Sequence, residues 1–289
     1  MDTPGFKKTR IAPTPSGYVH LGNVLSFAIT AVLAEKTGAK ILLRIDDLDK
    51  ARVNRDYVQD IFDTLNFMEI PWDEGPHNVG EFEAEYSQLH RLGKYNDALK
   101  QLATNGKLFA CTCSRKQLLN GDTCTCFERH IPLATDNASW RPITKNNEKL
   151  IVKNYGEGIT HATLPVDMHN FIVRKKDGFP SYQLTSVVDD LFYGVDLVVR
   201  GEDLWPSTLA QLQLALALGD NNFGDIAFFH HPLLMATPGE KLSKSAGATS
   251  IKYLRENGKK PGDIYQLIAG MLGNKETISG KEQLVSAIF

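Results

Sequence analysis

Residues 10–23 read RIAPTPSGYVHLGN, and this stretch decides the fold. Residues 9–12 predict the end of a short strand, and the prolines that follow predict a turn. HLGN at 20–23 then stands at the first turn of a predicted helix, where free backbone N–H groups attract phosphate. Gly22 lets a nucleotide approach the backbone, and His20 can donate to a phosphate oxygen. A helix-start histidine beside a packing glycine gives the same pattern without a ligand, so HLGN alone leaves both interpretations open.

The segments that follow HLGN predict a β-α-β unit. Apolar residues recur at helical spacing from Leu21 to Lys36, and Gly38 supplies a helix end. The apolar run from Ile41 to Ile45 is typical of a buried parallel strand. Strand, helix and strand in this order predict a right-handed crossover of the Rossmann type. We therefore expect an α/β protein with a Rossmann-type parallel sheet that binds a nucleotide.

The composition is that of an ordinary soluble globular protein. Of 289 residues, 42% are hydrophobic, and 32 Lys and Arg stand against 34 Asp and Glu, which gives a net charge of −2. This balance argues against indiscriminate coating of nucleic acid, although a local basic surface can still dock one RNA. No stretch approaches the apolar length of a membrane span, so we expect a cytoplasmic protein.

The remaining pattern predicts a sheet interrupted by an insertion. A Rossmann-type catalytic domain is expected over 1–104 and 169–245, an inserted subdomain over 105–168, and a helical segment over 246–289. Strands are expected at 171–174 and 196–200. Helices are expected at 56–67, 87–104, 206–218, 251–256 and 263–272.

All four cysteines fall in one short stretch, CTCSRKQLLNGDTCTC, at Cys111, Cys113, Cys124 and Cys126. Two CxC pairs joined by a short loop can place four thiolates at the corners of a tetrahedron, which suits zinc. Disulfides and unpaired thiols are the alternatives, and a reducing cytosol disfavours disulfides. His130 is a possible substitute for one cysteine. Four thiolates leave no open position for water, so this zinc is expected to be structural.

A second candidate binding segment reads GEKLSKS, from Gly239 to Ser245. Its glycine supplies a hinge, and Lys241 and Lys244 are spaced to direct two cations at one target. A polyphosphate fits, because lysine is a mobile point charge that can follow a departing pyrophosphate. A solvated basic turn gives the same isolated KxxK pattern.

HLGN and KLSKS together resemble the two signature motifs of class I aminoacyl-tRNA synthetases. Three more blocks, LLRIDDLD at 42–49, FPSYQLTSVVDD at 179–190 and VVRGEDL at 198–204, extend the resemblance to the catalytic domain of glutamyl-tRNA synthetases and their short paralogue, glutamyl-Q tRNA(Asp) synthetase. The resemblance spans roughly residues 8 to 275. Only 44 residues follow Ser245, too few for an anticodon-reading domain, so the glutamyl-Q branch is favoured.

The resemblance implies that ATP and glutamate react to form an adenylate, whose glutamyl group passes to the queuosine base of tRNA(Asp). The expected ligands are ATP with Mg²⁺, L-glutamate, tRNA(Asp) and a structural Zn²⁺; a monomer that binds no membrane is expected. His20, Lys241 and Lys244 are the implied catalytic residues. The implied ATP contacts are His20, Gly22, Asn23, Glu202, Asp203 and Lys244. The implied glutamate contacts are Arg10, Ala12, Ser16, Asp46, Tyr182 and Arg200.

The chemistry of glutamate supports these assignments, since two carboxylates need guanidinium partners and one ammonium needs a carboxylate. Arg10 and Arg200 follow predicted strands, although an arginine is more often a surface ion pair. A tyrosine such as Tyr182 is, outside this context, more often a core aromatic whose hydroxyl reaches water. Asp46 stands where the family has glutamate, and Ser186 where it often has asparagine. Adenylation of another amino acid or acceptor, and an idle tRNA-binding module, therefore remain as alternatives.

Overall fold

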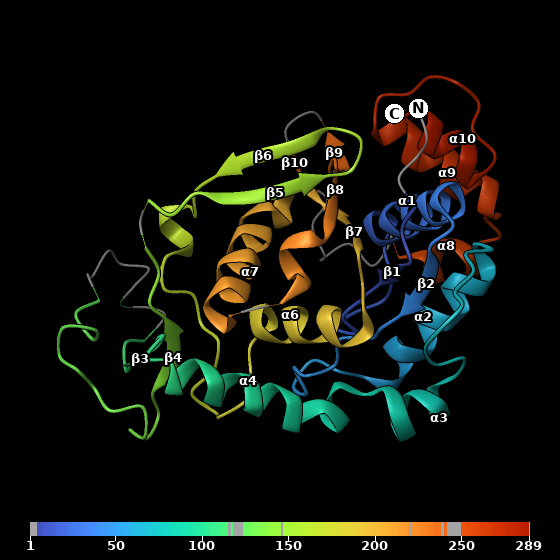
Figure 1. Ribbon diagram of the computed structural model, residues 1–289. Helices are drawn as coiled ribbons and strands as arrows, with labels where there is room; N and C mark the ends of the chain where they lie inside the picture. Colours follow the sequence, from blue (N-terminus) through green and yellow to red (C-terminus); the bar gives the residue numbers. More distant parts are fainter. Residues whose placement is uncertain are drawn as a thin grey trace. The chain divides into compact units, whose positions relative to one another are not determined.

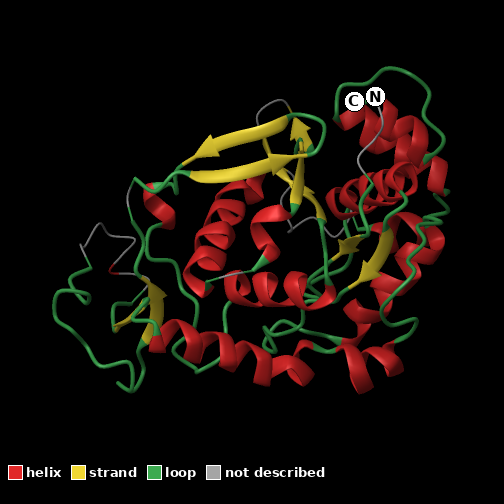
Figure 2. Cartoon of the chain, viewed as in Figure 1, coloured by secondary structure: helices red, strands yellow, loops and turns green. Residues whose placement is uncertain are grey.

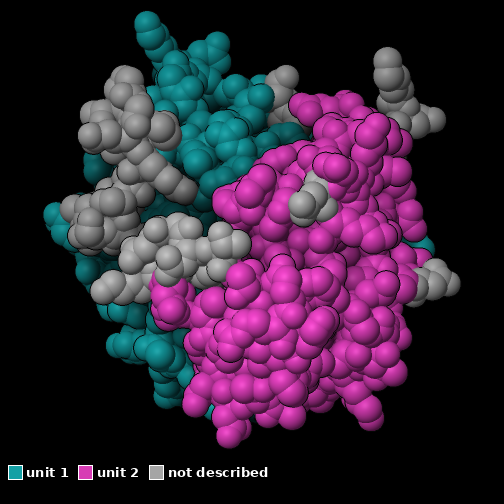
Figure 3. Space-filling model, turned by 90° about the vertical axis from the view of Figure 1, so that its left-hand side faces the viewer, with its two compact units in different colours: residues 1–90, 195–203, 228–289 teal, residues 91–194, 204–227 magenta. Residues whose placement is uncertain are grey.

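The computed structural model describes residues 5–114, 117, 124–145, 147–219, 221–237, 240–241 and 250–288. The chain divides into two compact units (Figure 3). Unit 1 comprises residues 1–90, 195–203 and 228–289, and unit 2 comprises residues 91–194 and 204–227. The predicted insertion at 105–168 lies within unit 2. The division into a split catalytic domain, an insertion and a helical segment stays a prediction.

Unit 1 is built on a parallel sheet (Figure 1). Strand β1 (Lys8–Ile11) pairs in parallel with β2 (Lys40–Leu43) on one side and with β7 (Leu197–Gly201) on the other. Strand β8 (Ala227–His231) continues the sheet beyond β7. The Asp196 carboxylate accepts hydrogen bonds from the backbone N–H groups of Lys7 and Lys8, at 2.8 and 2.9 Å, and fixes the register of β1 against β7. The predicted Rossmann-type α/β fold is confirmed.

Helix α1 (Leu21–Thr37) connects β1 to β2 and forms the centre of the core in unit 1. Eleven of its residues are buried, because the sheet covers one side and the C-terminal helices α9 (Pro261–Met271) and α10 (Lys281–Ser286) cover another (Figure 1). A helix that is apolar on nearly every face is typical of such a position. Gly38 ends α1 in the left-handed region at φ 76°, as predicted.

Both units contain helices and strands (Figure 2). In unit 1 the remaining elements are α2 (Arg55–Phe67), α3 (Val79–Glu81), the π-helical turn η1 (Phe82–Tyr86), β9 (Met235–Thr237), β10 (Glu240–Lys241) and α8 (Ile251–Glu256). Two 3₁₀ turns, η2 (Gln88–Arg91) and η4 (Glu202–Leu204), begin in unit 1, and the last residue of each belongs to unit 2. In unit 2 they are α4 (Leu92–Thr104), β3 (Leu108–Cys111), β4 (Ser139–Pro142), β5 (Leu150–Asn154), β6 (Gly158–Ala162), η3 (Val166–Met168), α6 (Tyr182–Tyr193), α7 (Trp205–Leu218) and η5 (Asn222–Asp225). Within the described part of the chain, no helix has the length and apolar run that a membrane span requires.

Two predictions about unit 2 are wrong. The stretch 171–174 is no strand: it makes only isolated bridges, between Arg174 and both Trp140 and Pro180. Asn170 precedes it in the left-handed region at φ 54°, which interrupts an extended chain, and Pro180 has no N–H to continue a ladder. The helix expected from residue 87 begins at Leu92, after the 3₁₀ turn η2.

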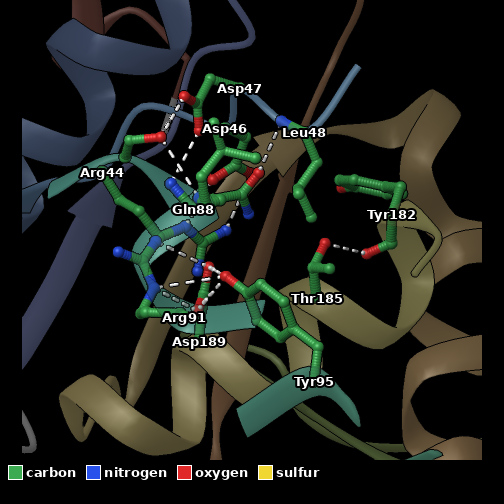
Figure 4. Close-up of polar contacts among 12 residues, drawn as sticks. Arg44, Asp46, Asp47, Leu48, Gln88, Arg91, Tyr95, Tyr182, Thr185 and Asp189 are labelled. Atoms are coloured by element: carbon green, nitrogen blue, oxygen red, sulfur yellow. Dashed lines mark hydrogen bonds and ion pairs between the residues drawn. The ribbon is translucent and has the colours of Figure 1, made fainter. Parts of the chain in front are cut away.

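A buried ion pair joins α4 to α6 inside unit 2 (Figure 4). The Arg91 guanidinium donates to both Asp189 carboxylate oxygens, Nε at 2.8 Å and Nη2 at 3.1 Å, and the Tyr95 hydroxyl donates to the same carboxylate at 2.8 Å. The side chains of Arg91 and Asp189 are 5% and 0% exposed. The carboxylate is therefore satisfied entirely inside the protein, and α6 is fixed against α4.

Removing the carboxylate of this pair should destabilise the protein strongly. We expect Asp189→Ala to lower the free energy of unfolding by about 3–5 kcal/mol, because it leaves the Arg91 cation buried without its counter-charge. Tyr95→Phe removes one hydrogen bond and should cost about 1 kcal/mol. Urea unfolding followed by circular dichroism measures both. Equal losses in the two variants would contradict this account of the network.

Candidate active site

Helix α1 begins at HLGN in a way that explains the spacing of its histidine and glycine. His20 is the extended residue before the helix, and its carbonyl accepts from the N–H groups of Asn23 and Val24, at 2.9 and 3.2 Å. The Asn23 side-chain oxygen accepts in return from the N–H of His20 at 3.2 Å. A Cβ at Gly22 would lie 3.1 Å from Cε1 of the His20 ring. The glycine therefore leaves room for the imidazole ring at the start of the helix.

The carboxyl ends of β1, β2 and β7 meet at the same edge of the sheet as this helix start, because the three strands are parallel. Open α/β sheets bind their ligands at this edge. The predicted site residues of unit 1 that lie at these strand ends or in the segments that follow them are Arg10, Ala12, Ser16, His20, Gly22, Asn23, Asp46, Arg200, Glu202 and Asp203. Their roles as ligands of ATP or glutamate stay predictions.

Arg10 and Arg200 lie on adjacent strands and are both buried, at 7% and 4% exposed. Nη1 of Arg10 donates to the carbonyl of Val199 at 3.1 Å, and the Arg200 guanidinium lies 5.0 Å from the centre of the Phe228 ring. The alternative of surface ion pairs is therefore wrong for both. Two permanently charged guanidinium groups beside each other make this part of unit 1 attractive to anions.

His230, on β8, lies beside these two arginines. Its ring stacks on Phe228, with the ring centres 6.1 Å apart. Burial and the positive charges of Arg200 and Arg10, together with neighbouring His231, lower the pKa of His230 to about 3. The imidazole is therefore neutral at physiological pH. Sequence reasoning missed this residue; the pair of consecutive histidines at 230 and 231 was the available signal.

The segment after β2 is fixed by two carboxylates (Figure 4). Nε and Nη2 of Arg44 donate to the two oxygens of Asp46, at 2.7 and 3.0 Å, and both side chains are buried. Asp47 accepts from the Ser87 hydroxyl and, at 2.7 Å, from the N–H of Gln88. The predicted ammonium partner Asp46 is thus held in one orientation by Arg44, which the sequence did not indicate.

Other predicted site residues lie elsewhere or outside the described residues. Tyr182 is the first residue of α6 in unit 2 and is 42% exposed, so the alternative of a core aromatic is wrong. Ser186, one turn later, is buried at 4% exposed. Lys244 lies outside the described residues, and for Lys241 only the backbone, in β10, is described.

The four cysteines form one cluster in unit 2, at the end of β3 and in the turn at 124–127. Their sulfur atoms lie within 4.8 Å of one another, with Cys111 to Cys124 at 3.7 Å, Cys113 to Cys124 at 3.8 Å and Cys113 to Cys126 at 3.5 Å. Four sulfurs around a tetrahedral zinc lie about 3.8 Å apart, given a Zn–S distance of about 2.3 Å. All four are free thiols, and His130 is not a member of the cluster. The arrangement is consistent with a zinc site.

The ionisation of these thiols also fits a cation. Burial and the adjacent sulfurs raise the pKa of Cys113 to about 12. Burial opposes the ionisation of Cys126 as well, but hydrogen bonds, first from the backbone of Thr112 and then from the thiol of Cys113, outweigh it and lower its pKa to about 6. Four thiolates at this spacing would repel one another, and a divalent cation at the centre of the cluster would allow all of them to ionise.

Comparison with known families identifies the chain. The model of the class I tRNA synthetases (E and Q), catalytic domain, matches residues 7–130 and 157–287. The chain belongs to this family. Its relatives include a glutamyl-Q tRNA(Asp) synthetase of Nitratidesulfovibrio vulgaris, which is 33% identical over 91% of this chain and 86% of its own length. They also include a glutamate–tRNA ligase of Dehalococcoides mccartyi, 31% identical over 96% of this chain and 59% of its own length.

The chain thus spans less than two thirds of the length of the glutamate–tRNA ligase that it matches. Its fold is that of a glutamate–tRNA synthetase from Elizabethkingia anophelis, with a TM-score of 0.75 at 22% identity, over 98% of this chain and 66% of the other. The predicted family and the predicted Rossmann-type fold are both confirmed.

The cysteine cluster makes a direct prediction about metal content. We expect the purified protein to contain about one zinc ion per chain, because four thiolates complete a tetrahedral site. Cys113→Ser and Cys124→Ser should each lose most of the metal and lower the melting temperature. His130→Ala, a nearby residue outside the cluster, should keep it. Elemental analysis of the purified variants measures the metal; full zinc in both serine variants would rule out the tetrathiolate site.

The neutral state of His230 predicts a loss of stability in acid. Its pKa is lower in the folded chain than in the unfolded chain, so the unfolded chain binds more protons once the pH falls below about 6.5. Stability should therefore decrease as the pH falls from about 6.5 towards 3, and less steeply in His230→Gln. Urea unfolding at pH 7.5 and pH 5 measures this slope. An unchanged slope would show that His230 does not carry the effect.

Proposed function

We propose that this chain activates glutamate with ATP and transfers it to tRNA. The observation that carries the proposal is the pair of buried guanidinium groups, Arg10 and Arg200, on adjacent parallel strands whose ends lie at the edge where α1 begins. A dicarboxylic amino acid supplies the two anions that such a pair recognises. The N-terminus of α1 supplies a site for phosphate on the same edge.

The proposed chemistry is adenylation. The α-carboxylate of glutamate attacks the α-phosphate of ATP in line, which forms the glutamyl-adenylate and releases pyrophosphate. His20 and the first turn of α1, with Gly22 and Asn23, hold the triphosphate, and Glu202 and Asp203 lie towards the adenosine. Lys241 and Lys244 stabilise the leaving pyrophosphate. Mg²⁺ bound with ATP neutralises part of the phosphate charge. No protein nucleophile is needed, because positioning and charge stabilisation supply the rate.

The amino-acid contacts follow from charge. Arg10 and Arg200 bind the carboxylates, and Ser16 adds a hydroxyl hydrogen bond. Asp46 receives the ammonium, and Ala12 contributes backbone. A hydroxyl hydrogen bond from Tyr182 stays a prediction from the sequence. Because Arg44 donates to both oxygens of Asp46, this carboxylate keeps a fixed orientation.

For the acceptor we propose the queuosine base of tRNA(Asp). A glutamyl-Q tRNA(Asp) synthetase is among the relatives, and the chain covers 86% of its length. A hydroxyl of the acceptor nucleotide attacks the adenylate and releases AMP. The zinc of the cysteine cluster would be structural, since four thiolates close its coordination sphere. A chain that acts alone in the cytoplasm remains part of the proposal.

The test is pyrophosphate exchange with ATP and Mg²⁺ across the twenty amino acids, without tRNA. We expect exchange with glutamate, lost in Lys244→Ala. Arg200→Met should raise the KM for glutamate roughly 30- to 160-fold and leave the KM for ATP nearly unchanged, since a charge-assisted hydrogen bond contributes about 2–3 kcal/mol. Arg52→Met, an exposed arginine paired with Asp49, is the matched control.

Each outcome separates one part of the proposal. Exchange with another amino acid would mean that Asp46 and Ser186 change the specificity of the pocket. No exchange, either alone or with tRNA added, would favour the idle tRNA-binding module. If glutamate exchanges, the next measurement is transfer of labelled glutamate to tRNA(Asp) with and without queuosine; labelling of the queuosine-free tRNA to the same extent would refute the proposed acceptor.

A further inference from the structure

Val19, the residue before HLGN, is held through both of its backbone groups. Its N–H donates to Oδ2 of Asp60, on α2, at 2.7 Å. Its carbonyl accepts from the N–H of Ile251, the first residue of α8, at 2.8 Å. The Val19 side chain is 3% exposed. The position of His20, the next residue, is therefore determined by two helices that are distant in sequence.

The contact with α8 extends over three successive pairs. His20 forms an antiparallel bridge with Ser250, and Val19 contacts Ile251 as above. The ammonium of Lys252 donates to the Tyr18 hydroxyl at 3.3 Å and lies 4.6 Å from the centre of the same ring. Residues 18–20 thus run antiparallel to residues 250–252. This contact joins the start of α1 to the start of α8.

Helix α2 supports the opposite side of the same turn. Tyr57 and Asp60 are three residues apart and so lie on one face of α2. The Tyr57 ring meets the Tyr18 ring edge-on, with the ring centres 4.9 Å apart. Asp60 is 2% exposed, and its Oδ1 has no hydrogen-bond partner among the described residues, so its bond to Val19 accounts for the position of the carboxyl.

The charged groups near Asp60 do not replace this bond. Burial raises the pKa of Asp60, and the bond from Val19 and the charges of Arg255 and Lys252 oppose that shift, while Asp63 adds to it. Arg255 has its own partner in Asp63, at 3.4 Å. A buried carboxyl with one hydrogen bond is costly to the fold. The position of Asp60 is therefore better explained by its bond to the Val19 backbone than by a contribution to stability alone.

We infer that Asp60 is a positioning residue for ATP, which fixes Val19 and thereby holds His20 at the start of α1. The inference rests on the proposed function, in which His20 acts on the phosphates. It extends the functional machinery to α2, whose residues touch no substrate. Loss of the bond lets the start of α1 shift, and a small displacement of such groups is enough to slow phosphoryl chemistry.

The test compares Asp60→Ala and Asp60→Asn with Asp56→Ala and Asp56→Asn, the exposed carboxylate one turn earlier on α2. Asp60→Ala should raise the KM for ATP at least about tenfold and lower kcat for pyrophosphate exchange, with the KM for glutamate changed less than about threefold. Asp60→Asn keeps an oxygen acceptor for Val19 and should retain most of the activity. Both Asp56 variants should behave as the unaltered protein.

Two outcomes would overturn the inference: equal ATP effects in the Asp60 and Asp56 variants, or a change confined to the KM for glutamate. If neither Asp60 variant folds, Lys252→Met tests the other side of the contact at a half-buried position. It should raise the KM for ATP about two- to fivefold, and no change in that KM would count against the inference.

Amide hydrogen exchange separates this inference from the proposed function. The Val19 amide should exchange about tenfold faster in Asp60→Ala than in Asp56→Ala, whether or not the protein exchanges pyrophosphate. Unchanged protection of that amide would overturn the inference even in an active enzyme. If protection falls as expected while the unaltered protein activates no amino acid, the proposed function fails and the contact through Val19 stands. ATP binding measured by calorimetry then replaces the kinetic readout.

Discussion

The parallel pairing of β1 with β2 and β7 is the constraint on which the rest of unit 1 depends. Parallel strands end at the same edge, so the pairing places Arg10, Arg44 and Arg200 at or near one edge without any direct contact being required among them. The connection from β1 to β2 must cross back over the sheet, and α1 makes that crossing with its N-terminus at the same edge. One backbone topology thus places buried guanidinium groups and a helix N-terminus at the same edge.

The charges at this edge decide what can bind there. A guanidinium group cannot lose its proton, so the two buried arginines keep their positive charge. The adjacent His230 is kept neutral, since a further cation would add repulsion. At the same edge, Arg44 and Asp46 form an ion pair. The permanent positive charge of Arg10 and Arg200 therefore favours an anionic ligand over a neutral one.

Local patterns in the sequence predicted the elements that carry this edge. The apolar periodicity of α1 and its glycine end, the runs at β2 and β7, and the helix α7 all correspond to segments whose conformation is set by neighbours in the chain. The strand prediction for 171–174 was wrong because an apolar run does not show whether Asn170 and Pro180 permit the hydrogen bonds of a β-ladder. The cysteine cluster succeeded because its four members are close in sequence. Partners that are distant in sequence, such as Asp189 for Arg91, left no local signal.

The same distinction explains why the role of Asp60 could not be predicted from the sequence. Nothing in the sequence of α2 distinguishes Asp60 from Asp56 or Asp63, and only its burial against Val19 separates the three. Sequence motifs mark the residues that touch a ligand, whereas the residues that hold those motifs in place are found by asking which buried polar group each backbone amide requires. For Val19, the residue before HLGN, the partners lie on α2 and at the start of α8. The geometry of this helix start is therefore a property of unit 1 as a whole, and the stability of unit 1 sets the precision with which the helix N-terminus is held.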